Sequence, residues 1–317
     1  MSLTKINPIK HILDHHSVLI LDGALATELE AYGCDLDDPL WSARILLEQP
    51  ELISRVHYDY FKAGADCAIT ASYQATIDGF AQRGIKKKEA VELIKKTVEL
   101  AREARDDFWK EEARLDRPKP IVAASVGPYG AYLADGSEYV GNYGISDEKL
   151  VEFHRPRVKA LVEAGADVLA FETLPSFQEA KVLAALLEEF PDTYAWLSFT
   201  LKTGESISDG TPLQDCAEMV KEHPQITAIG INCSPIEEAT SAISELRRCT
   251  DKSIIIYPNS GETYDAATNT WHGQESCVRF GRQSEIWYEA GARILGGCCR
   301  TSPNDIKAIA DKWRSCN

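Results

Sequence analysis

The chain has 317 residues, of which 44% are hydrophobic and 26% charged, so it holds ample apolar material for a core. Its formal charge is −15 at pH 7, which disfavours contact with phosphate backbones and argues against a nucleic-acid partner. The sequence shows neither a bilayer-length apolar run nor a secretory signal, so we expect a cytoplasmic protein with no membrane partner. Nine cysteines in such a chain are not expected to form a disulfide framework.

Short apolar runs alternate with helical patterns along the chain. We expect eight strands, in chain order at 18–21, 67–70, 121–125, 168–171, 196–200, 228–231, 254–257 and 293–295. We expect the helices that follow them at 50–63, 89–110, 147–164, 177–190, 213–221, 236–249, 278–290 and 303–313. Most of the strands are continuously apolar, which is typical of strands buried on both faces of a parallel sheet.

A recurring turn supports this arrangement. Ala-Gly-Ala occurs at 63–65, 164–166 and 290–292, each time between a helical pattern and an apolar run. Glycine at that place ends a helix in the left-handed conformation and returns the chain to its sheet. The alternation predicts a single (β/α)8 TIM-type barrel domain over residues 1–317. A doubly wound open sheet is less favoured because the turn at 22–26 lacks a dinucleotide-binding glycine pattern.

Polar residues follow the apolar runs where a barrel enzyme places its chemistry, at the C-terminal ends of the strands. The longer segments 35–49 and 130–145 follow the first and third strands, so we expect them to lie over the same face. The polar strand-end residues are Asp22, Thr70, Ser72, Glu172, Thr200, Asn232, Cys233, Asn259, Cys298 and Cys299.

Three of these residues are thiols. Cys233 ends the sixth strand, and Cys298 and Cys299 end the eighth after a Gly-Gly pair, which we expect to permit an unusual turn. Three thiolates suit Zn²⁺, at about 2.3 Å, and leave its fourth tetrahedral position open, as in a catalytic zinc site. Buried packing cysteines and a redox-active vicinal disulfide are the alternatives.

Two carboxylates, Asp22 and Glu172, end the first and fourth strands, where a buried charge needs a partner. A substrate ammonium would provide one, and hydrogen bonds from neighbouring loop amides are the alternative. The backbone amides around Ser72 are candidates for holding a substrate carboxylate. No histidine stands at a predicted strand end, so a histidine-based hydrolase has no support.

Four motifs together identify a family. Residues 21–24 (LDGA), 230–233 (GINC), 257–261 (YPNSG) and 296–300 (GGCCR) closely resemble those of the homocysteine S-methyltransferases, over about residues 19–306. Residues 70–76 and 125–130 are most similar to the bacterial branch that uses S-methylmethionine. The resemblance implies a (β/α)8 fold, zinc on Cys233, Cys298 and Cys299, homocysteine as acceptor, and Asp22 and Glu172 facing its amino group. Ser72 and Asn232 complete the expected substrate-binding set.

The expected reaction is methyl transfer to homocysteine, forming methionine. Coordination to zinc deprotonates the homocysteine thiol, and a sulfonium donor leaves as a neutral thioether without needing a general acid. Trp41, Tyr73 and Tyr129 are candidates for aromatic contact with the sulfonium. The alternatives are S-adenosylmethionine or betaine as donor, selenocysteine as acceptor, a non-catalytic zinc or thiol sensor, and a metal-free barrel lyase.

Overall fold

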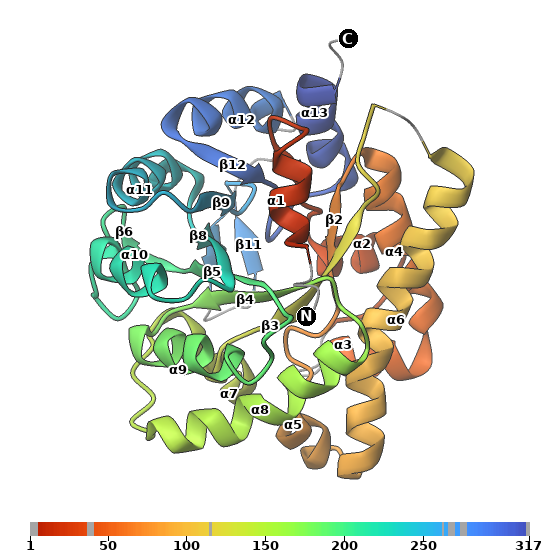
Figure 1. Cartoon of the computed structure of the whole chain (residues 1–317). Coiled ribbons are helices and arrows are strands. Elements are labelled where there is room, and N and C mark those ends of the chain that lie inside the picture. Colours follow the sequence, from red (N-terminus) through yellow and green to blue (C-terminus); the bar gives the residue numbers. More distant parts are fainter. Residues whose placement is uncertain are drawn as a thin grey trace, which may run out of the picture.

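The computed structural model describes residues 6–36, 41–113, 116–261, 263–265, 270–272 and 278–314, with the side chains of 41–43, 263–265, 270–272 and 278–279 left out. Eight parallel strands lie in the order β1-β12-β9-β8-β5-β4-β3-β2. A parallel bridge between Leu21, next to β1, and Cys67 of β2 joins the two ends of this order. The result is the expected (β/α)8 barrel, with helices around the strands (Figure 1).

All eight predicted strands are present. They are β1 Leu19–Ile20, β2 Cys67–Ile69, β3 Ile121–Val126, β4 Val168–Leu174, β5 Ala195–Phe199, β8 Ile226–Asn232, β9 Ser253–Tyr257 and β12 Ala292–Leu295. The eight predicted helices are also present. They are α4 Pro50–Ala63, α6 Lys87–Glu112, α8 Asp147–Glu163, α9 Phe177–Leu187, α10 Leu213–Lys221, α11 Ile236–Cys249, α12 Val278–Ala290 and α13 Pro303–Arg314.

Shorter elements were not predicted, because a helix of one or two turns shows too little periodicity to be recognised. The additional helices are α1 Pro8–Leu13, α2 Leu25–Ala31, α3 Trp41–Glu48, α5 Ile77–Gln82, α7 Tyr129–Leu133 and the 3-10 helix η1 Ser137–Tyr139. Two hairpins pair β6 Leu201–Thr203 with β7 Ser206–Ile207 and β10 Thr263–Asp265 with β11 Thr270–His272.

The turn that follows α4 and α12 has the predicted geometry. Gly64 has a φ of 115° and Gly291 a φ of 125°, both in the left-handed region. The amide of Gly64 bonds back to the carbonyls of Tyr60 and Phe61 and thereby ends α4. Glycine is therefore required here by the backbone conformation.

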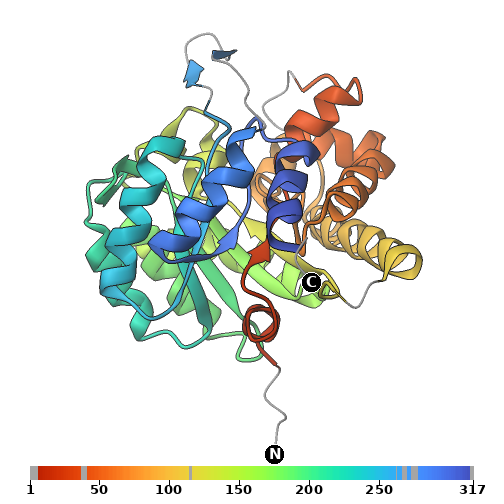
Figure 2. The ribbon, with the colours of Figure 1, turned by 90° about the horizontal axis from the view of Figure 1, so that it is seen from above.

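The barrel interior is apolar at the end where α1 lies. Ile9 and Ile12 of α1 are buried in one cluster with inward-facing strand residues such as Leu19, Val168 and Trp196. Figure 2 shows α1 at one end of the barrel and the β10–β11 hairpin at the other. The strands start on the α1 side, so their C-terminal ends open toward the opposite face. None of the described helices is both long and apolar enough to cross a membrane.

One buried histidine makes the stability of this fold depend on pH. His57 of α4 is 1% exposed, and neither of its ring nitrogens has a hydrogen-bond partner among the described residues. Burial lowers the pKa of His57 to about 4, so the unfolded chain binds this proton more tightly than the folded protein does. Acidification from about pH 6.5 to about pH 4 should therefore destabilise the fold, by at most about 1.4 kcal/mol per pH unit for this residue.

We expect His57→Leu to remove this acid-dependent loss of folding stability. The variant should gain stability relative to the parent as the pH falls through that window, measured as the difference between their urea midpoints at each pH. A difference that stays constant between pH 7 and pH 4 would contradict the assignment.

Candidate active site

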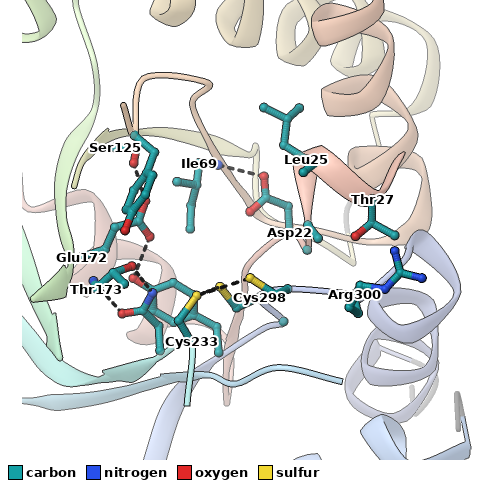
Figure 3. A pocket seen from close by; sticks show the side chains of 18 of the residues that line it. Asp22, Leu25, Thr27, Ile69, Ser125, Glu172, Thr173, Cys233, Cys298 and Arg300 are labelled. Carbon is teal, nitrogen blue, oxygen red and sulfur yellow. Dashed lines mark hydrogen bonds between the residues drawn. The ribbon is translucent and has the colours of Figure 1, made fainter. Parts of the chain in front are cut away.

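The three predicted thiols converge at the C-terminal ends of β8 and β12. The Sγ atom of Cys233 lies 2.6 Å from that of Cys298 and 3.6 Å from that of Cys299. All three sulfurs lie within 4.8 Å of one another, and each residue is half-buried. The fold thus brings Cys233 next to Cys298, which lies 65 positions later in the chain, as Figure 3 shows.

Backbone hydrogen bonds between neighbouring strand ends hold these thiols in place. The amide of Cys298 donates to the carbonyl of Pro258 at 2.8 Å, and the amide of Cys233 donates to that of Tyr257 at 3.3 Å. The carbonyl of Cys299 accepts from the amide of Ser260 at 3.1 Å. The segment after β9 therefore links the two thiol-bearing segments.

The Gly-Gly pair before the thiols acts differently from the prediction. Neither Gly296 nor Gly297 has a positive φ, so an unusual turn is not the reason for glycine here. A Cβ on Gly296 would lie 2.5 Å from that of Leu21, and one on Gly297 would lie 2.4 Å from the hydroxyl of Thr301. Glycine is needed at both positions because Leu21, directly after β1, and Thr301 approach this backbone closely.

Strained backbone occurs at the site itself. Cys233 has a φ of 46° and Thr173 a φ of 58°, which is unfavourable for a side chain and most of all for a β-branched one. Asn232 supports Thr173 in this conformation. Its Oδ1 accepts from the amide of Thr173 at 2.8 Å, and its Nδ2 donates to the Thr173 hydroxyl at 2.8 Å. Asn232 lines the pocket, but its amide group is engaged by the protein.

The donor set fits a soft metal ion. Three cysteine sulfurs suit Zn²⁺ or another thiophilic ion. Hydrogen bonds from Cys233 and Cys298 lower the pKa of the Cys299 thiol, whereas the pKa values of Cys233 and Cys298 are raised. Among the described residues no other group of three Cys, His, Asp or Glu side chains converges in this way. Cys277 and Cys316 lie outside the described residues.

The two predicted carboxylates face the same hollow, from opposite sides in Figure 3. Asp22 is 4% exposed, and its Oδ2 accepts from the amide of Ile69 at 2.8 Å. Burial raises the pKa of Asp22 well above its usual value, and the charge of Glu172 raises it further. No basic side chain of the described chain forms a salt bridge with Asp22.

Glu172 lies within β4 and is 6% exposed. Its Oε1 accepts from the hydroxyl of Ser125, and its Oε2 accepts from that of Tyr257 at 3.0 Å. The Tyr257 hydroxyl in turn accepts from the indole of Trp196 at 3.1 Å. Burial raises the pKa of Glu172 to about 7. Its position is fixed by hydrogen bonds, yet its charge has no cationic partner in the part of the chain that the structure describes.

Ser72 follows β2, as predicted, but its side chain does not line the hollow. It is fully buried and is not among the residues that line the pocket. Its hydroxyl donates to the carbonyl of Ser125 at 2.7 Å, and its amide donates to that of Thr70 at 2.8 Å. Both polar groups are occupied by the protein, so Ser72 supports the wall of the pocket and offers no free group to a substrate.

The hollow that these residues line has a volume of about 370 Å³. Its lining also includes residues that were not predicted from the sequence: Leu25, Thr27, Glu30, Ile69, Glu138, Tyr139, Thr173 and Arg300. Segment 130–145 was expected over this face, and η1 confirms it, but nothing in its composition distinguished Glu138 or Tyr139. Tyr73 lines the hollow, whereas the ring of Tyr129 packs on Phe153 at 4.9 Å and is not part of the lining. The side chain of Trp41 is outside the described part.

A buried polar network holds the segment that contains η1. The carboxylate of Glu179 accepts from the amide of Tyr129 at 2.6 Å and from the hydroxyl of Tyr143 at 3.1 Å. It also lies 2.7 Å from Nε2 of His154, whose other ring nitrogen meets Arg157. Burial lowers the pKa of His154 to about 4, so its neutral ring bridges the carboxylate and the guanidinium.

Comparisons with known proteins agree with this geometry. A family model described as homocysteine S-methyltransferase matches residues 19–313. Homocysteine S-methyltransferase YbgG of Bacillus subtilis (strain 168) is 61% identical over 310 residues, which cover 98% of this chain and 98% of that protein. Two crystal structures of the homocysteine methyltransferase MmuM from Escherichia coli are similar to this chain, each with a TM-score of 0.89.

The metallated form of MmuM shares 50% identity, covering 96% of this chain and 100% of that chain. The oxidized form shares 51%, covering 96% and 99%. These matches confirm the resemblance predicted from the four motifs. The chain therefore belongs to the homocysteine S-methyltransferase family, and it is a methyltransferase.

Proposed function

We propose that this enzyme transfers a methyl group from S-methylmethionine to the thiolate of L-homocysteine, forms methionine, and depends on zinc. The observation that carries the proposal is the convergence of Cys233, Cys298 and Cys299 at a hollow whose walls bear two buried carboxylates. Family membership supports homocysteine as acceptor, and the metallated form of the similar MmuM supports a metal ion. The cluster of free thiols is consistent with action in the reducing cytoplasm.

The three cysteines would hold the zinc ion, which when bound supplies the Lewis acidity that keeps the acceptor sulfur ionised at neutral pH. Asp22 and Glu172 bind the ammonium group of homocysteine and so orient its side chain toward the cysteines. Ser125 and Tyr257 hold the carboxylate of Glu172 in place for this role. Asn232 and Thr173 shape the wall beside Cys233.

In the transfer step the homocysteine sulfur forms a bond to the donor methyl carbon. The bond between that carbon and the donor sulfonium breaks, and its electron pair stays on the donor sulfur, which becomes a neutral thioether. The thiol proton of homocysteine leaves to solvent before this step. The protein contributes by aligning the three atoms and by excluding water, which is worth several powers of ten in rate.

The donor is tested by measuring methionine formation from homocysteine with S-methylmethionine, S-adenosylmethionine and betaine at equal concentration. We expect the highest kcat/KM with S-methylmethionine. Methionine formation with betaine but with neither sulfonium donor would overturn the donor assignment. Tight zinc binding without methionine from any donor would favour the sensor alternative.

A further inference from the structure

The charges that line the hollow are unequal. Among the described residues that line it, four bear carboxylates, namely Asp22, Glu30, Glu138 and Glu172, and one, Arg300, is basic. Arg300 already lies 3.2 Å from the carboxylate of Glu30. The proposed function uses Asp22 and Glu172 for the ammonium of homocysteine. Glu138 is therefore the one lining carboxylate that neither the acceptor nor a described salt bridge accounts for.

Glu138 is held over the hollow by its segment. The segment leaves β3 through α7, forms η1 and ends before α8, and Glu179 fastens both sides of η1 through Tyr129 and Tyr143. Within it, the amide of Tyr139 bonds to Gly136 at 3.0 Å and that of Gly141 bonds to Ser137 at 3.1 Å. Glu138 thus projects from a short hydrogen-bonded turn with fixed ends.

The surroundings of Glu138 combine negative charge with aromatic rings. Glu138 is half-buried and Tyr139 is 43% exposed, and both line the hollow together with Tyr73. Burial raises the pKa of Tyr73, and the charge of Glu138 raises it further. Burial also raises the pKa of Glu138 itself, to about 7, and nearby Asp135 adds to the effect. A carboxylate among aromatic rings is a recognition site for an organic cation.

We propose that Glu138, with the rings of Tyr139 and Tyr73, recognises the positive charge of the methyl donor and selects methyl-onium cations. The proposal rests on the methyl transfer proposed above and assigns its donor subsite. A sulfonium donor loses its positive charge when the methyl group leaves, so Glu138 attracts the donor more strongly than the thioether product. The same carboxylate thereby favours donor binding and product release.

The test is steady-state kinetics with Glu138→Gln, which keeps the size of the side chain and removes its charge. We expect the KM for the donor to rise on the order of 10- to 100-fold, as for a lost charge pair that is partly shielded from water. The KM for homocysteine should stay within about two-fold, because Asp22 and Glu172 are untouched. Glu138→Asp should recover part of the loss.

Asp135→Asn is the matched control. Asp135 is exposed, belongs to the same segment and does not line the hollow, and its Oδ1 accepts from the amide of Ser137, which asparagine can still do. This variant should keep the donor KM of the parent within about two-fold, because the charge of Asp135 is the smallest of the influences on the pKa of Glu138. Parallel assays with S-methylmethionine, S-adenosylmethionine and betaine distinguish sulfonium from quaternary ammonium donors.

Each other outcome is decisive. A rise in the KM for homocysteine equal to that for the donor, or an unchanged donor KM in Glu138→Gln, would overturn the donor subsite and leave the methyltransferase assignment intact. A parent protein that forms no methionine from any of the three donors would overturn the proposed function and this inference with it.

Discussion

Cys298→Ser is expected to abolish metal retention and methionine formation while leaving the fold intact. Cys298 supplies one of three sulfurs within 4.8 Å of one another, and serine offers a hard oxygen that a thiophilic ion binds poorly. Substitution of a residue that hydrogen-bonds to a metal ligand typically costs about 10- to 100-fold in metal affinity or activity. Loss of a ligand itself should therefore cost more than about 100-fold. The measurement is zinc per chain together with kcat/KM, and circular dichroism checks the fold.

Cys249→Ser is the control for this variant. Cys249 is also a half-buried free thiol, but it lies at the end of α11, outside the lining of the site. Its replacement should leave zinc content and kcat/KM unchanged. Full activity in Cys298→Ser, or an equal loss in Cys249→Ser, would show that the converging thiols are not the metal site.

Glu172→Gln is expected to weaken homocysteine binding. The amide has the size of the carboxylate and keeps a hydrogen-bond acceptor for Tyr257, but it cannot neutralise an ammonium group. Removing one partner of a buried ion pair costs about 2–5 kcal/mol, so the KM for homocysteine should rise about 30-fold or more. The KM for the donor should change far less, which distinguishes this variant from Glu138→Gln.

Glu189→Gln is a suitable control, because Glu189 pairs with Arg155 on the exposed surface. Surface pairs of this kind contribute at most about 1 kcal/mol, so its KM values should match those of the parent. An unchanged homocysteine KM in Glu172→Gln would contradict the ammonium-binding role of Glu172.

Much of the fold could be predicted from the sequence because strands buried on both faces are continuously apolar. Four of the eight predicted helices, among them α4 and α11, have the predicted bounds, since proline or a turn marks where each begins or ends. The short elements η1 and α7 were not predicted. They are stabilised by tertiary contacts such as the bonds of Glu179, and local sequence does not encode those.

Only part of the site could be predicted from the sequence, because tertiary contacts decide which side chains line the hollow. Thiols and carboxylates at strand ends stand out in a sequence, and Cys233, Asp22 and Glu172 all line the hollow. Ser72 was selected because it follows a strand, but the structure turns it toward Ser125. Glu138 was not predicted, because local sequence does not distinguish it from a solvent-exposed glutamate. Only the fold places it at the hollow.

The most direct test of the central claim measures methionine formation from homocysteine and S-methylmethionine before chelation, after chelation and after zinc is added back. We predict that activity is lost on chelation and restored by about one zinc per chain, because three thiols in one cluster form one site. Turnover that persists in the fully chelated protein would contradict zinc dependence and the role assigned to Cys233, Cys298 and Cys299.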